Sequence, residues 1–198
     1  MFPMIMSIEE LRTTASNMRK TGLNSQQIAD ELSLSQDTIA WLLAGDNKSN
    51  DAPSDVRIGW RTIGVKPSRI EAIGMIMADI AEEEVGSGNI STTVGISING
   101  ILFAQVVSSY LDSEIAIHRN IDGAPGAGSL SSKYGQVQGK KVIIVDDVLS
   151  SGVTMTKTIQ TMRELGAEPV LAVVLVNKTT RNEIDGVPLR GVIRAVPV

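Results

Sequence analysis

Two adjacent aspartates and a cluster of small hydroxyl residues stand out in the stretch KKVIIVDDVLSSGVTM, residues 140–155. Asp146 and Asp147 follow a run of aliphatic residues that is typical of a buried parallel strand. The next turn leads into a helix and offers hydroxyl groups, a glycine and unpaired backbone N–H groups. We therefore expect a phosphate group to bind at the turn residues Ser150, Ser151, Gly152, Val153 and Thr154.

The two carboxylates must contact a different part of the ligand, because negative charges beside a phosphate would repel it. Asp146 and Asp147 can accept hydrogen bonds from sugar hydroxyls or contact a magnesium ion. A phosphorylated sugar would satisfy both halves of the motif. The turn has neither the lysine of a P-loop nor the glycine spacing of a dinucleotide-binding motif. The alternative interpretation is an acidic strand end followed by an ordinary capped helix.

Composition argues against several other kinds of site. The 198 residues include no cysteine and a single histidine, His118, which excludes thiolate chemistry and argues against a catalytic triad or a multi-histidine metal site. The net charge of -4 gives no general attraction to nucleic acid. No segment has the composition of a signal peptide or a membrane span, so we expect a cytoplasmic protein with no membrane partner.

The order of elements predicts two units. Residues 45–55 are rich in turn formers, so we expect a small helical domain over residues 1–45, a linker over 46–56 and a larger domain over 57–198. In the larger domain, buried strands alternate with amphipathic helices, which predicts an α/β fold with a parallel sheet. The predicted strands are 91–98, 114–119, 141–146 and 170–176, and the predicted helices are 68–84, 100–111 and one that begins after Gly152. Ligands of such sheets bind beyond the carboxyl ends of the strands, where the acidic motif lies.

The N-terminal stretch SQQIADELSLSQDTIAWLLAG, residues 25–45, has the pattern of a helix-turn-helix. Ile28, Ala29 and Leu32 share one helical face, and Ser35 can cap a second helix over residues 36–43. Ser33 stands where a glycine is usual. The start of the second helix faces bases in DNA-binding proteins of this type, and the residues there are Ser35, Gln36 and Thr38. A helical hairpin used for dimerisation or packing is the alternative.

The charge of this N-terminal unit gives weak support for DNA binding. The second helix carries no cation, although phosphate contacts dominate DNA affinity. Basic residues follow the linker and could contact phosphates; they are Arg57, Arg61, Lys66 and Arg69. Residues 57–64, RIGWRTIG, could form a wing beside the helices, or the basic residues could simply be a solvated surface.

The acidic motif resembles the signature of the type I phosphoribosyltransferases, which bind 5-phosphoribosyl-1-pyrophosphate (PRPP), and the resemblance extends over residues 57–198. It implies the phosphoribosyltransferase fold, with Asp146 and Asp147 on the ribose hydroxyls and residues 150–154 on the 5-phosphate. It also implies a Mg²⁺ ion that arrives with PRPP and is not bound directly by the protein. VGISINGILFA, residues 94–104, is similar to the pyrophosphate loop, which implies diphosphate contacts by Ile98, Asn99 and Gly100.

Within this family, the chain is most similar to the orotate phosphoribosyltransferases. It differs from them in three places. Residues 118–135 take the place of the mobile catalytic loop, with His118, Arg119 and Lys133 as its candidate cations. Orotate enzymes commonly carry a lysine where this chain has Asn99, and they have more cations in the mobile loop. Lys178, where an arginine usually reads the orotate carboxylate, is the candidate base reader.

Two hypotheses follow for function. The first is a DNA-binding transcriptional regulator, similar to the archaeal regulators that resemble orotate phosphoribosyltransferases, whose larger domain senses PRPP or a related ribose 5-phosphate ligand. It implies DNA as a partner and a homodimer. The second is an active phosphoribosyltransferase that joins PRPP to orotate or another base. Asn99 and the cation-poor loop favour the regulator, because cations would stabilise a departing pyrophosphate.

Overall fold

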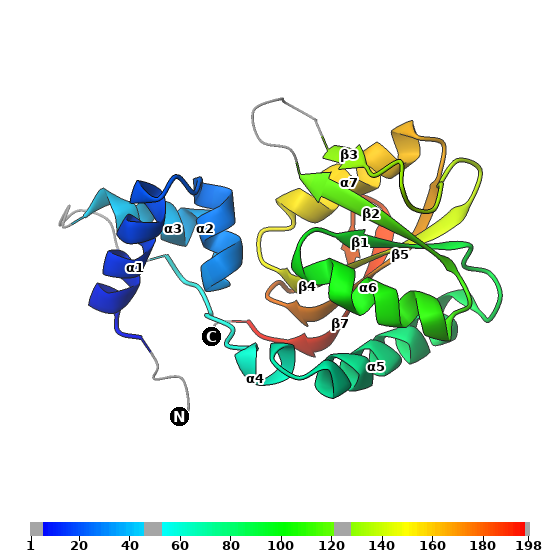
Figure 1. The fold of residues 1–198 in the computed structure, drawn as a ribbon, viewed down its shortest axis with the longest axis horizontal. Helices are drawn as coiled ribbons and strands as arrows, with labels where there is room; N and C mark the ends of the chain where they lie inside the picture. Colours follow the sequence, from blue (N-terminus) through cyan, green and yellow to red (C-terminus); the bar gives the residue numbers. More distant parts are fainter. Residues whose placement is uncertain (1–5, 46–52, 121–127, 197–198) are drawn as a thin grey trace. The chain divides into compact units, whose positions relative to one another are not determined.

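The computed structural model describes residues 6–45, 53–120 and 128–196. These divide into two compact units with the boundary between Gly59 and Trp60, and each unit is described by itself (Figure 1). The second unit has its own sheet, and the first is helical. In the described part of the chain, no helix is both long enough and apolar enough to cross a membrane.

The first unit packs three helices around a small apolar core. The helices are α1 (Ile8–Lys20), α2 (Ser25–Leu32) and α3 (Gln36–Ala44). Capping boxes at Ser7 and Asn24 begin α1 and α2, because each cap side chain accepts an otherwise unpaired N–H of the first turn. The core residues are Ala15, Ile28, Ala29, Leu32, Leu34, Ile39 and Leu42.

The turn between α2 and α3 begins with a residue in the left-handed conformation. Ser33 ends α2 with a φ of 53°, in the left-handed region that favours glycine. Ser35 then caps α3 by accepting a hydrogen bond from the N–H of Thr38 at 3.1 Å. The two predicted helices and the predicted cap are therefore present.

Of the two alternatives for residues 57–64, the structure excludes the wing. Residues 57–60 form no strand, and the following segment is the short helix α4 (Arg61–Gly64), which belongs to the second unit. Trp60 packs its ring against Phe103 of the second unit, with 6.0 Å between the ring centroids. Trp60 is thus used for packing in the α/β unit, and the described residues of the first unit are entirely helical or irregular.

The second unit is built on a sheet of seven strands in the order β3-β2-β1-β4-β5-β7-β6. Its five inner strands are parallel, and the edge strands β3 and β6 run antiparallel to their neighbours. This order places β1 and β4 side by side, so their carboxyl ends meet. The strands are β1 (Thr92–Ile96), β2 (Glu114–Asn120), β3 (Gly128–Leu130), β4 (Lys141–Leu149), β5 (Glu168–Asn177), β6 (Glu183–Ile184) and β7 (Val187–Arg194).

Helices cover both faces of the sheet (Figure 1). Helix α7 (Val153–Glu164) packs Met155, Ile159 and Met162 against alternate residues of β4 and β5. Helices α5 (Pro67–Val85) and α6 (Asn99–Tyr110) pack against each other and against the inner strands. At their crossing, a Cβ on Gly74 would lie 2.5 Å from Val106 Cγ1, so the glycine allows the close approach.

Three details differ from the sequence prediction. The strands β3, β6 and β7 were not expected, because they are short or contain Pro and Gly and lack a continuous apolar run. Strand β4 continues through the two aspartates to Leu149 instead of ending at residue 146. Helix α5 begins at Pro67, one residue before the predicted start, because the fixed φ of proline suits the first helical position.

Candidate functional site

The acidic pair lies near the carboxyl end of β4 and is held by contacts on both sides. Asp147 is buried and Asp146 is half-buried. The backbone N–H of Asp147 donates to Asp146 Oδ1 at 2.9 Å, and Asn99 Nδ2 donates to Asp147 Oδ2 at 3.0 Å. Burial raises the pKa of the Asp147 carboxyl, while hydrogen bonds from the Val148 backbone and from Asn99 act in the opposite direction.

The predicted pyrophosphate loop lies directly against this pair. It joins β1 to α6, and its Ser97–Ile98 peptide bond is cis. Ile98 is 81% exposed, so this side chain faces away from the core. A Cβ on Gly100 would lie 2.6 Å from the Val145 carbonyl oxygen and 3.0 Å from both Cα and Oδ1 of Asp146. Glycine at position 100 is therefore what allows α6 to begin beside the aspartates.

The predicted phosphate turn follows the pair and opens onto helix α7. Gly152 is buried, has a φ of 84° and precedes α7, which begins without a side-chain cap. Ser150 is half-buried and Ser151 is exposed, and Ser151 Oγ lies 3.4 Å from the Val153 nitrogen. Val153 and Thr154 are the first two residues of α7. N–H groups at such a helix start favour an anion.

Two residues that we assigned to the mobile loop are instead part of the sheet. His118 and Arg119 lie in β2, and His118 is fully buried. That assignment is wrong, because β2 continues to Asn120 and pairs with β3. Lys133 is exposed in a turn after β3. The remainder of the predicted loop, residues 121–127, lies outside the described residues.

His118 links the two loops of the candidate site through hydrogen bonds and does not face a ligand. Its backbone oxygen accepts the N–H of Ser97, at the start of the pyrophosphate loop, at 2.9 Å. Its Nδ1 lies 3.1 Å from Thr158 Oγ1, and that hydroxyl donates to the Thr154 carbonyl oxygen at 2.9 Å. One buried residue thus connects the segments that form both phosphate loops. Sequence reasoning missed this role of Thr158; the available signal was its position four residues after Thr154, on the same side of a helix.

Lys178 follows β5 and is half-buried. Its backbone N–H donates to the carbonyl oxygen of Leu149 at 2.9 Å, which places it beside the end of β4 and the phosphate turn. The neighbouring Asn177 is fully buried and organises the next turn: its Nδ2 donates to the Arg181 carbonyl oxygen, and its Oδ1 accepts from Thr179. Asn177 is therefore a structural residue, whereas the backbone of Lys178 lies next to the candidate ligand site.

The three predicted DNA contacts differ in accessibility. Thr38 is buried, and its hydroxyl donates to Asp55 Oδ2 at 2.8 Å, so its assignment as a base contact is wrong. The Ser35 hydroxyl caps α3, and the Ser35 N–H also donates to Asp55. Gln36 is exposed, and its Nε2 donates to Gln26 Oε1. Gln36 therefore remains as the candidate base contact, with Gln26 as a neighbour that the sequence prediction missed.

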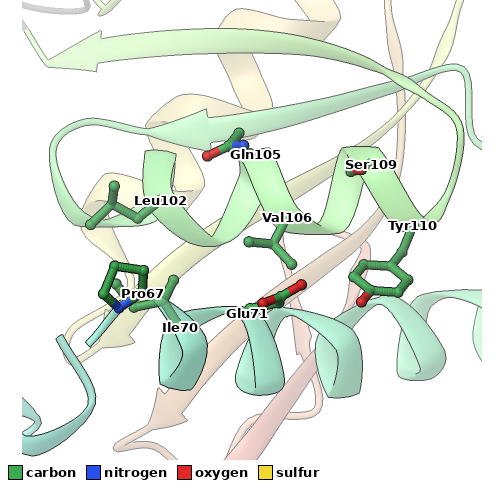
Figure 2. Close-up of a pocket in the computed structure, with 8 residues that line it drawn as sticks. All are labelled: Pro67, Ile70, Glu71, Leu102, Gln105, Val106, Ser109 and Tyr110. Carbon is green, nitrogen blue, oxygen red and sulfur yellow. The ribbon is translucent and has the colours of Figure 1, made fainter. Parts of the chain in front are cut away.

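A hollow of about 340 Å³ lies elsewhere in the second unit, between α5 and α6 (Figure 2). Leu102, Val106 and Tyr110 point from α6 toward α5 in this view, and Glu71 lies among them. None of the predicted ligand-site residues lines the hollow. The candidate ligand site therefore lies at the carboxyl ends of β1 and β4 and not in this groove.

Comparisons with known families and solved structures agree with this geometry. A model of the phosphoribosyl transferase domain matches residues 60–192. Among solved structures, the orotate phosphoribosyltransferase from Aeropyrum pernix has a TM-score of 0.60, with 20% identity over 91% of this chain and 92% of that chain. An adenine phosphoribosyltransferase from Trypanosoma brucei has a TM-score of 0.56, with 18% identity over 72% of each chain. At these identities the structures establish the fold alone.

Curated relatives match nearly the whole chain, including its N-terminal helices. The transcriptional regulator GfcR of Thermoplasma acidophilum is 42% identical over 95% of this chain and 96% of its own length. The regulator of the same name from Picrophilus torridus is 40% identical over 97% of this chain and 99% of its own length. The chain therefore belongs to the family of GfcR transcriptional regulators, which carry a phosphoribosyltransferase domain.

Proposed function

We propose that this regulator binds operator DNA through its N-terminal helices and senses PRPP, or a related ribose 5-phosphate ligand, through its phosphoribosyltransferase-like domain. The observation that supports the ligand half is that three segments meet at the carboxyl end of β4. Asn99 and Gly100 contact the acidic pair on β4, and β4 leads through Leu149 into the phosphate turn. Together these segments offer acceptors for sugar hydroxyls and donors for a phosphate.

The contact between Asn99 and Asp147 supports sensing over turnover. Asn99 is neutral and its amide is engaged with a buried carboxylate, so it brings no positive charge to a departing diphosphate. A Mg²⁺ ion would reach this site with PRPP, held by the ligand's own phosphates and not directly by the protein. In the described part of the chain, no group of three histidine, cysteine or acidic residues could hold a metal by itself.

The ligand half is tested by thermal unfolding of the full chain with PRPP and magnesium. Binding to the folded state alone stabilises it by about 2.7 kcal/mol at a hundredfold excess of ligand over Kd, so a clear rise in Tm is expected. The double variant Asp146→Asn, Asp147→Asn should lose that rise, because amides replace both charged acceptors. A parent protein that shows no shift with PRPP, ribose 5-phosphate or a nucleotide monophosphate would remove this half of the proposal.

The DNA half is tested by gel shift on the DNA upstream of the protein's own gene, at a stated salt concentration because phosphate contacts depend on salt. Gln36 is exposed at the start of α3, and its donation to Gln26 leaves Oε1 and one N–H for a base such as adenine. Gln36→Ala should therefore weaken operator binding about tenfold, by the usual 1–3 kcal/mol of one bidentate base contact. Binding to unrelated DNA should not change.

Gln160→Ala is a matched control for the gel shift, because Gln160 is exposed on α7 in the other unit. It should bind the operator as the parent does. Equal operator affinity of Gln36→Ala and the parent would exclude Gln36 as a base contact, and a parent that binds no upstream DNA would contradict the DNA half altogether.

We further propose that the protein acts as a homodimer. A ligand can change DNA affinity only if it binds two arrangements of the protein with different affinities, and a dimer provides such arrangements of two DNA-binding units. Sedimentation with and without PRPP measures the oligomeric state.

Active transfer of ribose 5-phosphate to a base is the second candidate. It is favoured by the likeness in fold to an orotate phosphoribosyltransferase over 91% of this chain. Incubation with PRPP, magnesium and a panel of bases measures it as pyrophosphate release. Rapid release with any base would rank this candidate above sensing.

A further inference from the structure

A cation lies at the edge of the phosphate turn, and the site described so far does not use it. Arg181 belongs to the segment between β5 and β6. Its Nη1 lies 3.4 Å from the position that a Cβ would take on Gly152. Gly152 is the residue before α7, so the guanidinium lies beside the point where backbone N–H groups begin the helix. Twenty-nine positions separate the two residues in the sequence, and only the fold brings them together.

The backbone of Arg181 is held in place by hydrogen bonds that are anchored on the buried Asn177. Its carbonyl oxygen accepts hydrogen bonds from Asn177 Nδ2 at 2.9 Å and from Arg194 Nη2 at 3.2 Å. Its N–H donates to Thr179 Oγ1 at 3.2 Å, and Thr179 in turn donates to the fully buried Asn177. The segment is thus a hydrogen-bonded turn that directs the side chain of Arg181 toward Gly152.

The charge of Arg181 is not neutralised by an acidic neighbour in the described residues. Two other arginines of this domain do have acidic partners: Arg163 bonds Asp185 at 2.8 Å, and Arg190 Nη2 bonds Glu84 at 2.8 Å. Asp146 and Asp147 make the neighbouring end of β4 negative, which opposes the binding of an anion there. A guanidinium beside the turn offsets this repulsion and offers two parallel donors that match a phosphate.

We propose that Arg181 is a ligand-binding residue whose guanidinium contacts a phosphate monoester held on residues 150–154. This inference rests on the proposed function, because it assigns a further contact to the same ligand. It concerns the 5-phosphate end of the ligand and not its diphosphate, since the predicted diphosphate contacts, Ile98 to Gly100, lie on a different loop. The contact supplies charge that the turn itself lacks, because residues 150–154 contain no cation.

The test is isothermal titration of the full chain with ribose 5-phosphate. Arg181→Ala should weaken binding by at least about tenfold, in line with the loss of one charge-assisted hydrogen bond. Arg181→Lys should lose less, because it keeps the charge and loses the paired donors. Lys141→Ala is the matched control: it removes the same charge from an exposed residue at the opposite, amino end of β4, and its affinity should equal that of the parent.

A second probe, inorganic pyrophosphate with magnesium, separates a direct contact from a general effect of charge. Its affinity should be the same in Arg181→Ala and in the parent. An equal loss for both probes, or no loss for ribose 5-phosphate, would overturn the assignment of Arg181 and leave the proposed function intact. A parent that binds neither PRPP nor ribose 5-phosphate would overturn both. Circular dichroism of each variant checks folding, and Arg181→Lys gives the answer if Arg181→Ala does not fold.

Discussion

Lowering the pH from 7 to 4 is expected to remove about 3 kcal/mol of unfolding free energy from the phosphoribosyltransferase domain through His118 alone. Burial lowers the pKa of His118 from 6.5 to about 4 in the folded state. The ring is fully buried, and its Nε2 has no hydrogen-bond partner among the described residues, so a second ring proton would be both desolvated and unpaired. Protonation therefore favours the unfolded chain.

The tautomer of the neutral ring follows from its one hydrogen bond. Thr158 Oγ1 has a single proton and donates it to the Thr154 carbonyl oxygen, so it must accept from Nδ1–H of His118. Nε2 is then the unprotonated nitrogen. The contribution of neutral His118 to the free energy of unfolding is fully present above pH 6.5, falls by about 2 kcal/mol at pH 5, and levels off below the folded-state pKa near 4.

Urea unfolding of the parent and of His118→Asn at pH 7, 5 and 4 measures this effect. The asparagine amide can still donate to Thr158 but does not titrate in this range. His118→Asn is expected to be less stable than the parent at pH 7 and to lose less stability on acidification. Asp147 is common to both proteins, and its raised pKa favours the folded state at low pH, so it cancels in the comparison. Parallel pH profiles of the two proteins would contradict the prediction.

Replacing Gly100 with alanine is expected to lower stability by about 1–3 kcal/mol and to abolish detectable binding of PRPP. The added Cβ would lie 2.6 Å from the Val145 carbonyl oxygen and 3.0 Å from Asp146 Cα. Both are backbone atoms of the central strand, so the strain cannot be relieved by turning a flexible side chain. The start of α6 must move away from β4, which separates Asn99 from Asp147 and displaces Asp146.

Gly59→Ala is the matched control, because no atom lies within 4 Å of the position of its Cβ and its φ is not positive. Urea unfolding and titration with PRPP on both variants separate the two effects. Gly59→Ala should unfold and bind as the parent does. Normal binding by Gly100→Ala would mean that the close approach of α6 to β4 is not needed for the ligand.

The predictions for His118 and Gly100 concern the same arrangement, the two loops of the candidate site. Gly100 brings the pyrophosphate loop against the acidic pair from the α6 side, and His118 ties Ser97 and Thr154 together within the α/β unit. Both changes act on the distance between the loops that would hold the two ends of a ribose 5-phosphate ligand. We therefore expect ligand affinity to depend on residues that do not contact the ligand.

Local rules were enough to predict much of the fold. Ser35 is a helix cap in the structure as in the prediction, because capping depends on residues within one turn. The apolar runs of β1, β4 and β5 predicted parallel strands, because strands buried on both faces need such runs. The rule that ligands bind at the carboxyl ends of parallel strands also placed Asn99 and Asp147 at the same edge, although 48 positions separate them.

The sequence alone therefore determined the fold class, the helical N-terminal unit and the edge of the sheet where the candidate site lies. Tertiary structure decided what individual side chains do there: His118 is buried beneath the site, Thr38 is bound to Asp55, and Arg181 lies beside Gly152. The physical reason is that helix caps and strand patterns depend on near neighbours. The burial, pKa and partners of a polar side chain depend on segments that only the packed chain brings together.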